Sequence, residues 1–326
     1  MITKISSNRM VWLFAIIVYL WKYLLFILLL SSTVYILFEF IEIRGLGLKG
    51  GIPIGILGTA LSIFLSFRNN SAYDRWWEAR KIWGGLVNAS RIFSIQVITY
   101  ISNRDKDTSL EKVTSIQKAI LYRHIAYINA LRLNLRNQQE KYQVTLKDFL
   151  SKDELKSLLS FTNVPTQIIH NQSQHLKDIL NNNFIEDFRL YEMMKTLGEF
   201  YNLQGKAERI KKTPFPMYYD FFIKVFVFIF VCLLPIALIG ILNDISGDGS
   251  VNWLVIPISV VVAFMFIIIE KTGSFTENPF EYYKEDVPLT SLCRTIEIDL
   301  REMIHDTNIP EPIKKEKILI DGEVLM

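Results

Sequence analysis

Four apolar blocks dominate the sequence, at residues 23–38, 51–67, 221–242 and 253–269. A helix needs roughly 20 apolar residues to cross the ~30 Å hydrocarbon core of a bilayer. Block 221–242 meets this requirement most clearly, whereas block 51–67 is short and rich in small residues. Short links join the first two blocks and the last two. The pattern predicts an all-α membrane protein with four transmembrane helices.

A shorter apolar stretch, residues 10–21, precedes the first block and is cut off by Lys22. We interpret residues 1–22 as an interfacial helix, because its aromatic residues suit headgroup depth and a lysine can extend its ammonium into water. The alternative is a cleaved signal peptide, but no small-residue cleavage site follows at the required distance.

The second and third blocks are separated by a polar stretch that is too long and too charged to cross a membrane. Basic residues gather at both of its ends, and basic flanks favour the cytoplasmic side. Four crossings then place both termini in the cytoplasm as well. The predicted organisation is an interfacial helix (1–22), transmembrane helices 1 and 2 (23–67), a cytoplasmic helical domain (68–212), transmembrane helices 3 and 4 (213–270) and a cytoplasmic C-terminal segment (271–326).

The polar stretch is predicted to be helical. Its apolar residues between positions 110 and 128 recur every three or four residues, which keeps one helix face apolar. Residues 185–212 give a second helical pattern. Pro214 and Pro216 then break the chain just before the third apolar block.

Charge and reactive residues exclude several classes of function. The chain has 36 basic and 33 acidic residues and a net charge of +3, which gives no case for nucleic-acid binding because that requires a clustered basic face. Cys232 and Cys293 indicate neither a disulfide framework nor a zinc site. The four histidines form no metal-binding motif, so an enzyme is not indicated and no cofactor is expected. A membrane scaffold whose helical domain binds a partner stays open.

The second apolar block divides into three faces when it is placed on a helix at about 100° per residue. No charged residue falls between positions 52 and 67. Such spans can surround an ion path only as several copies around an axis, with an apolar wall that gates by losing its water. The small-residue face suits close helix packing, and either of the others could meet lipid. The faces are Ile52, Ile56, Thr59, Ala60, Ile63 and Phe67; Gly55, Gly58, Ser62 and Ser66; and Ile54, Leu57, Leu61, Phe64 and Leu65.

A segment dense in Arg, Asn and Trp follows directly, with the sequence RNNSAYDRWWEARKIWGGLVNASR at residues 68–91. Its aromatic residues suit the headgroup zone, and its acidic and basic residues are close enough on a helix to offset one another's charge. A helix end at the membrane interface explains why Arg, Asn and Trp occur here, but not why so many of them occur close together. The residues that define this motif are Arg68, Asn69, Asn70, Tyr73, Asp74, Arg75, Trp76, Trp77, Glu78, Arg80, Trp83 and Gly84.

This segment closely resembles the signature that follows the second span in the bestrophin family, in its bacterial form. TPFPMY at residues 213–218 resembles the proline motif that opens that family's third span, and Asn278, Pro279 and Phe280 match the motif after its fourth. The resemblance covers nearly the whole chain. It implies a ring-shaped homopentameric ion channel of the bacterial inner membrane, with one helix per subunit lining a narrow hydrophobic neck. The implied partners are further copies of the chain, monovalent ions and the lipid bilayer.

The resemblance also implies particular site residues. Its neck positions fall on Ile52, Ile56 and Ala60, and because Ala60 is small, Ile63 on the same face is a further candidate. The exit constriction of the cytoplasmic vestibule falls on Ile185, for which helix packing is an equally good interpretation.

The ion and its regulation are less clearly implied. The wider family implies anion selectivity, with chloride as the ion, but a charge-free neck has no charge with which to choose, so cation selectivity stays open. Animal members bind calcium through a run of acids after the Asn-Pro-Phe motif. Here that run, from Glu281 to Asp286, is interrupted by two tyrosines and a lysine. An oxygen-rich site of six to eight ligands is not expected from so few carboxylates.

Overall fold

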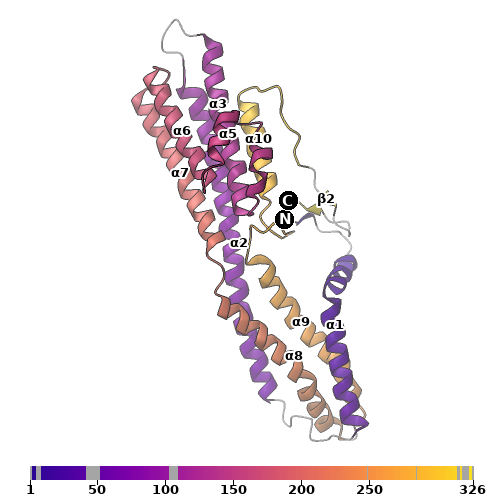
Figure 1. Cartoon of the computed structure of the whole chain (residues 1–326). Coiled ribbons are helices and arrows are strands. Elements are labelled where there is room, and N and C mark those ends of the chain that lie inside the picture. The colour runs from indigo at the N-terminus through magenta and orange to yellow at the C-terminus, as the bar shows by residue number, and fades with distance from the viewer. Residues whose placement is uncertain are drawn as a thin grey trace.

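The structure, a computed structural model, describes residues 2–4, 9–41, 52–102, 109–247, 249–283, 285–313, 316–317 and 323–324. Its longest element is α2 (Ile52–Tyr100), a helix of 49 residues. At a rise of 1.5 Å per residue, α2 is about 74 Å long, more than twice the hydrocarbon core of a bilayer. Figure 1 shows it running from the lower group of helices into the upper one. Arg68, where we predicted a domain boundary, therefore lies inside a continuous helix.

Three helical segments of the described residues are long and apolar enough to cross a membrane. They are Ile17–Glu39 of α1 (Arg9–Glu39), all of α8 (Met217–Ser246), and Asn252–Thr276. The last segment joins the short 3-10 helix η3 (Asn252–Leu254) to α9 (Val255–Thr276). The apolar part of α2, residues 52–67, packs beside α8 and α9 (Figure 1).

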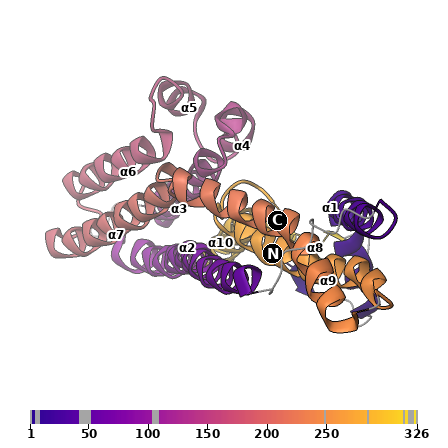
Figure 2. The same cartoon turned by 90° about the horizontal axis from the view of Figure 1, so that it is seen from below.

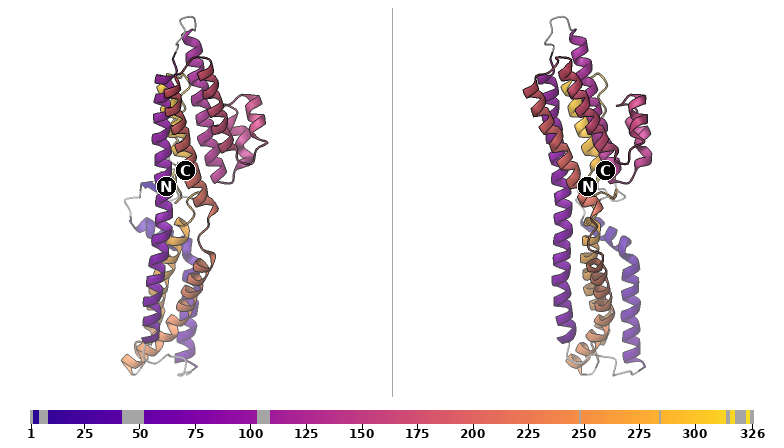
Figure 3. Two further views of the ribbon diagram at one scale, coloured as in Figure 1. Left: turned by 90° about the vertical axis from the view of Figure 1, so that its left-hand side faces the viewer. Right: turned by 60° about the vertical axis from the view of Figure 1, so that its left-hand side comes forward.

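The apolar helices form a thin layer in which α8 and α9 lie between α1 and α2. Helix α9 packs against α1, α2 and α8, and α8 also packs against α1 and α2. Figure 3 shows α2 along one side of the α8–α9 pair and α1 along the other. Among the described residues, the lower part of α2 has neighbours on one side, and its opposite face is uncovered. Buried apolar side chains of this layer include Ile27, Leu61, Leu65, Val227, Phe230 and Phe266.

The upper half of α2 belongs to a helical domain. It packs with α3 (Leu110–Leu135), α7 (Asp187–Lys212) and α10 (Leu289–Met303), and α6 (Val164–Asn181) packs against α3 and α7. One core of buried apolar side chains joins these helices. The short η2 (Gln139–Lys141), α4 (Tyr142–Leu146) and α5 (Lys152–Leu158) connect α3 to α6. Figure 2, seen from below, shows α5 and α6 on the side opposite to α1 and α9.

The helix patterns read from the sequence are confirmed in this domain. The apolar spacing predicted after position 110 is α3, whose Val113, Ile120 and Ile125 are buried. The pattern at 185–212 is α7, which begins at Asp187. Helix α7 ends at Lys212 and α8 begins at Met217, because the two prolines between them cannot continue a helical hydrogen-bond ladder.

The boundary predicted near the N-terminus, at Lys22, is absent from the structure. We predicted a separate helix ending at Lys22, but α1 is continuous from Arg9 to Glu39. Lysine is a good helix former, and the Lys22 side chain is exposed, so the charge interrupts the apolar pattern without interrupting the helix.

The C-terminal segment 271–326 is likewise not a separate unit. Helix α9 continues past the predicted boundary to Thr276. Helix α10 then turns Cys293, Ile296 and Leu300 into the core of the helical domain. The domain therefore contains residues from both sides of the last two apolar helices.

A small antiparallel sheet joins the two ends of the chain. Strand β1 (Ile2–Lys4) pairs with β3 (Glu323–Val324), which also pairs with β2 (Glu316–Lys317), in the order β1-β3-β2. Ile2 lies opposite Val324. Figure 1 shows both ends between the apolar helices and the helical domain. The prediction of a helical protein is confirmed, and within the described residues this sheet is the exception.

Candidate functional site: the open face of α2 and the Arg68 junction

The lower part of α2 is held by one of the three faces derived above. Leu61 and Leu65 are fully buried against α8 and α9, and Ile54 and Leu57 pack against the same cluster. Their partners include Phe230 of α8. Four residues of this face therefore anchor α2 to α8 and α9, whereas Phe64 on the same face is exposed.

The opposite face of α2 is apolar and uncovered. Ile56 is 66% exposed and Ile63 is 52% exposed, and Phe67 one turn further is also exposed. Ala60 lies between them and is partly covered. The backbone of Ile52 begins the helix, and its side chain lies outside the described residues. The candidate neck residues with described side chains thus share one open face.

The small-residue face is divided in the structure. A Cβ atom at Gly58 would lie 3.2 Å from a ring carbon of Phe230, whereas one at Gly55 would meet nothing within 4 Å. The sequence predicts close helix packing on this face, and at Gly58 the neighbour is an aromatic ring of α8. Ser62 donates to the Gly58 carbonyl at 2.8 Å, which satisfies its hydroxyl within α2.

At the end of the apolar segment, Arg68 is completely buried. Its guanidinium pairs with Asp220 of α8 and, at 3.0 Å, with Glu277 just after α9. It also donates to Ser274 Oγ at 2.9 Å and to the Glu270 carbonyl at 3.0 Å. We call this set the Arg68 junction. A buried guanidinium with acceptors on two other helices holds three helices at one point, since removing Arg68 would leave buried carboxylates without their shared cation.

The next residue makes the junction tight. Asn69 donates to the Ile269 carbonyl at 2.9 Å, which brings the α2 and α9 backbones close together. A Cβ atom at Gly273 would collide with the Asn69 side-chain oxygen and would lie 2.9 Å from Arg68 Nη1. Only a glycine leaves room for this approach.

Arg75 extends the contact to the end of α7. Its guanidinium donates to the carbonyls of Ile210 and Thr213 at 2.6 Å and to that of Glu277 at 2.8 Å. These bonds satisfy carbonyls at a helix end, where no further turn supplies N–H groups to donate to them. Burial lowers the pKa of the Arg75 guanidinium.

The charged residues Arg75 and Glu78 of the motif therefore interact with a second helix. We expected them to offset one another along one helix, yet Glu78 pairs with Arg209 of α7 at 2.6 Å and Arg75 caps α7. Asp74 and Asn70 are exposed, and Arg80 is partly buried beside Gly84.

The aromatic residues of the motif also differ from the headgroup prediction. Trp83 is fully buried in the core of the helical domain. Trp76 donates to the Glu285 carbonyl at 2.9 Å and stacks between Tyr73 and Trp77. Tyr73 and Trp77 remain exposed, so only these two keep the surface position that the sequence predicts.

The Asn-Pro-Phe motif joins α9 to the helical domain. Phe280 is buried in the domain core, and the Pro279 carbonyl accepts from the Val287 backbone N–H at 3.2 Å. Asn278 is partly buried. The motif therefore fixes where the chain returns from the apolar helices to the domain.

The acids after this motif are engaged or buried. Glu281 pairs with Lys211 at 2.6 Å. Asp286 is buried and accepts from the Tyr283 backbone N–H at 3.0 Å, and its burial raises its pKa to about 6. Across the described ranges, no group of three or more His, Cys, Asp or Glu residues is arranged to hold a metal ion.

Ile185 is not placed at a surface. Its side chain is 1% exposed and belongs to the core of the helical domain. This burial favours helix packing, the alternative left open from the sequence. Phe188, in the first turn of α7, is 75% exposed.

The sequence did not single out the acids of the Arg68 junction. Asp220 lies at the edge of the third apolar block, and Glu270 at the end of the fourth. A signal was present, because an acid inside or beside an apolar block requires a partner. The partner itself is more than 150 positions away, so no local spacing indicates it.

Within the described residues, three helical segments are long and apolar enough to cross a bilayer, and they pack beside a helix that continues into a polar helical domain. These features indicate an integral membrane protein. The family model described as Bacterial/Fungal Bestrophin protein matches residues 5–302. The chain therefore belongs to the bacterial and fungal bestrophin family.

Named relatives and solved structures agree with this assignment. The chain is 30% identical over 273 residues, 83% of either protein, to the voltage-dependent anion channel-forming protein YneE of Escherichia coli (strain K12). It is 28% identical to the voltage-dependent anion channel-forming protein sll1024 of Synechocystis sp., over 80% of this chain and 81% of the relative. The crystal structure of a bacterial bestrophin homologue from Klebsiella pneumoniae superposes with a TM-score of 0.77 at 26% identity, covering 87% of this chain and 98% of that one.

Proposed function

We propose that this chain is one subunit of an anion channel, in which the open face of α2 lines the pore. The observation that carries the proposal is the pair of exposed isoleucines, Ile56 and Ile63, opposite the face that anchors α2. An exposed apolar face with no partner in its own chain requires lipid or further protein. Relatives named as anion channel-forming proteins favour a pore.

In the proposed assembly, five copies surround an axis and each contributes one α2. The neck is then formed by rings of Ile52, Ile56, Ala60 and Ile63. No charged residue occurs from position 52 to 67, so permeating ions find no ligand there, and the neck acts as a hydrophobic barrier that conducts when it is wet.

The proposed topology has four crossings, the second made by residues 52–67. These 16 residues give about 24 Å of helix, slightly less than the hydrocarbon core. The helical domain and both termini are on the cytoplasmic side of the inner membrane. The pairing of β1 with β3 supports placing the two termini together.

Ion flux from liposomes containing the purified full-length protein tests the proposal. Reversal potentials in a bilayer under a salt gradient then give the sign of the ion. We expect flux and a reversal potential near that of chloride. A reversal potential near that of the cation would show a cation channel, and properly assembled protein without flux would favour a non-conducting scaffold. We expect conduction to persist in strong calcium chelator, because Glu281 and Asp286 are already engaged or buried.

A further inference from the structure

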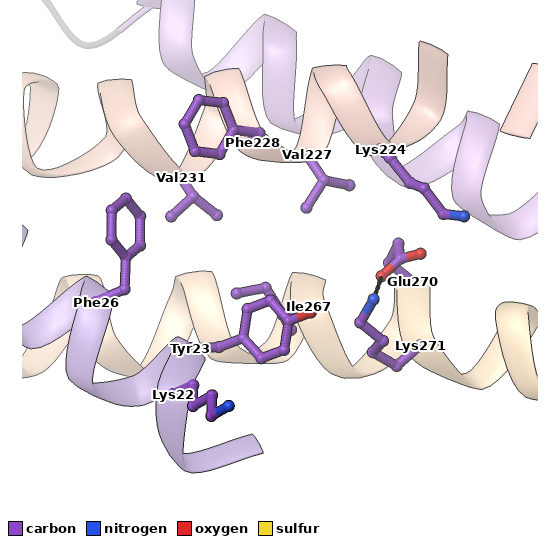
Figure 4. A pocket seen from close by; sticks show the side chains of 10 residues that line it. All are labelled: Lys22, Tyr23, Phe26, Lys224, Val227, Phe228, Val231, Ile267, Glu270 and Lys271. Carbon is purple, nitrogen blue, oxygen red and sulfur yellow. Dashed lines mark ion pairs between the residues drawn. The ribbon is translucent and has the colours of Figure 1, made fainter. Parts of the chain in front are cut away.

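A cavity of about 560 Å³ opens between α1, α8 and α9 (Figure 4). The Arg68 junction reaches this cavity through Glu270, one of its lining residues. The proposed pore face is on another part of the subunit, so the cavity has no role in the function proposed above.

One end of the cavity is apolar. The rings of Phe26 and Phe228 stack across it with their centroids 6.2 Å apart, and Val231 lines the wall between them. Figure 4 shows these three side chains together at one end. Phe26 and Phe228 are both exposed, at 42% and 59%. The apolar end is therefore accessible from the lipid side of the helices.

The other end is basic. Lys224 of α8 and Lys271 of α9 lie there beside Glu270, with Lys22 of α1 at the lower edge (Figure 4). Lys271 pairs with Glu270 at 3.1 Å, and Lys224 pairs with Asp220 at 2.5 Å. Within the described residues, Lys22 has no acidic partner within 4.0 Å.

Lys224 and Lys271 are each paired with a carboxylate, so Lys22 is the lysine of this end without an acidic partner among the described residues. Glu270 and Asp220 are both shared with the buried guanidinium of Arg68. Three lysines and one glutamate line the cavity, and Asp220 pairs with Lys224, so these groups together carry a formal charge of +1. A cavity with a positive end and an apolar end is complementary to an amphiphile with an anionic head.

The positions of Lys224 and Lys271 along their helices fit a lipid headgroup. Lys271 is five residues from the end of its span at Thr276. Lys224 is seven residues from the start of its span at Met217. These separations correspond to about 8–11 Å of helix, close to the boundary between headgroups and hydrocarbon.

We propose that this cavity binds one anionic phospholipid from the leaflet on the side of the helical domain. The phosphate lies among Lys22, Lys224 and Lys271, and an acyl chain lies along Phe26, Phe228 and Val231. A zwitterionic headgroup fits less well, because it brings a cation of its own to the basic end. A free anion fits less well because it leaves the apolar end empty.

Native mass spectrometry of the purified full-length protein tests the proposal. Dioleoyl phosphatidylglycerol and dioleoyl phosphatidylcholine share their acyl chains and differ in net charge. We expect the anionic lipid to bind more tightly. Lys22→Gln and Lys224→Gln should each weaken its binding about fivefold, since one lysine near a membrane contributes about that factor. Binding of phosphatidylcholine should change little.

Two controls separate this site from general attraction to a basic surface. Lys212→Gln removes a charge from the end of α7, where the side chain is 70% exposed and outside the cavity, and should leave binding unchanged. Lys224→Arg keeps the charge and should restore binding, which shows that the Gln variant did not fail through misfolding. Equal binding of the two lipids, or an equal loss in Lys212→Gln, would overturn the proposal. Displacement of the lipid by glycerol phosphate at a matched concentration would assign the site to a free anion instead.

Discussion

Arg68 connects α2 to α8 and α9 through buried ion pairs and hydrogen bonds. It is fully buried, and its partners come from α8, from α9 and from the segment after α9. Taking a guanidinium out of water costs several kcal/mol unless its donors are satisfied. Burial raises the pKa of the Glu277 carboxyl, while the Arg68 charge acts in the opposite direction. Such a cluster favours one arrangement of the helices, because any shift leaves charges unpaired.

Gly273 gives a residue-scale prediction about this junction. Gly273→Ala should destabilise the protein by about 1–3 kcal/mol, because the added methyl group meets Asn69 and Arg68 and forces α2 and α9 apart. Gly198→Ala in α7 is the matched control, since its Cβ would meet nothing within 4 Å. It should stabilise by about 0.5–1 kcal/mol. Thermal unfolding in detergent measures both, and a Gly273→Ala protein that melts like the wild type would contradict the tight approach.

His124 gives a prediction about pH. It is buried among Phe93, Tyr127 and Phe200, with Nε2 at 2.9 Å from the Ser90 hydroxyl, and burial lowers its pKa to about 3. Unfolding restores a pKa near 6.5, so the unfolded chain binds a proton that the folded chain refuses. Stability is therefore complete above pH 6.5 and falls as the pH drops from 6.5 toward 3, by up to about 1.4 kcal/mol per pH unit.

The His124→Gln variant isolates this effect, because a glutamine keeps a donor for Ser90 but does not titrate. We expect the melting temperature of the wild type to fall more steeply between pH 6.5 and 4.5 than that of the variant. Parallel curves for the two proteins would mean that His124 is hydrated and titrates normally.

At the scale of elements, α2 joins the proposed pore to the helical domain without a break. The same helix carries the open apolar face below Arg68 and the buried Trp83 and Phe93 above it. A continuous helix transmits a rotation or a tilt along its length more directly than two helices joined by a loop. A change in the domain is therefore expected to alter the position of the neck residues.

The two faces of α2 give a paired prediction. Ile56→Ala should raise conductance, because a shorter side chain on the open face widens and wets the proposed neck. Ile54→Ala removes the same volume from the face that packs on α8 and α9. It should lower stability by about 1–2 kcal/mol, less than a fully buried isoleucine would, and leave conductance nearly unchanged. Single-channel recording and thermal unfolding together separate the two effects. Equal increases in conductance would place the wrong face in the pore.

At the scale of the whole molecule, much of the apolar surface of one chain has no partner. Only 22% of the described α1 span is buried within the chain, and the open face of α2 is uncovered. Lipid can cover α1. A row of exposed isoleucines flanked by small residues on α2 is better suited to a neighbouring copy.

Mass measurement in detergent tests the assembly. We expect a particle of about five times the 38.0 kDa of one chain. Gly55→Leu should lower the fraction of pentamer without unfolding the subunit, because a Cβ there meets no atom of the described residues within 4 Å. Gly58→Leu should instead lower the melting temperature, because its side chain would meet Phe230. A wild-type monomer or dimer would remove the basis of the proposed pore.

Labelling of cysteines from outside intact cells tests the topology. In a background with Cys232→Ala and Cys293→Ala, Gln139→Cys in the helical domain should be protected from an impermeant reagent. Ile245→Cys should react, because this side chain is 73% exposed at the far end of α8. The opposite labelling pattern would reverse the orientation.

The sequence by itself determined the helical fold class, the apolar segments, the helix patterns of the domain and the break at Pro214 and Pro216. These depend on local spacing and hydropathy, which each segment carries whatever surrounds it. The grouping of Ile56 with Ile63, and of Leu61 with Leu65, also follows from helical periodicity. Periodicity could not say which face meets the protein, since both are apolar, and the packing of α8 and α9 decided this.

Only the tertiary structure decided the remaining features. Arg68 finds its carboxylates 152 and 209 positions away, and Gly58 faces an aromatic ring of α8. Ile185 is buried. Helix α10 packs into the core of the helical domain, although α8 and α9 separate it from the rest of that domain in the sequence. Each of these depends on which distant segments meet. A buried charge, a close backbone approach and a shared core are properties of pairs of segments, and no single stretch of sequence contains both members.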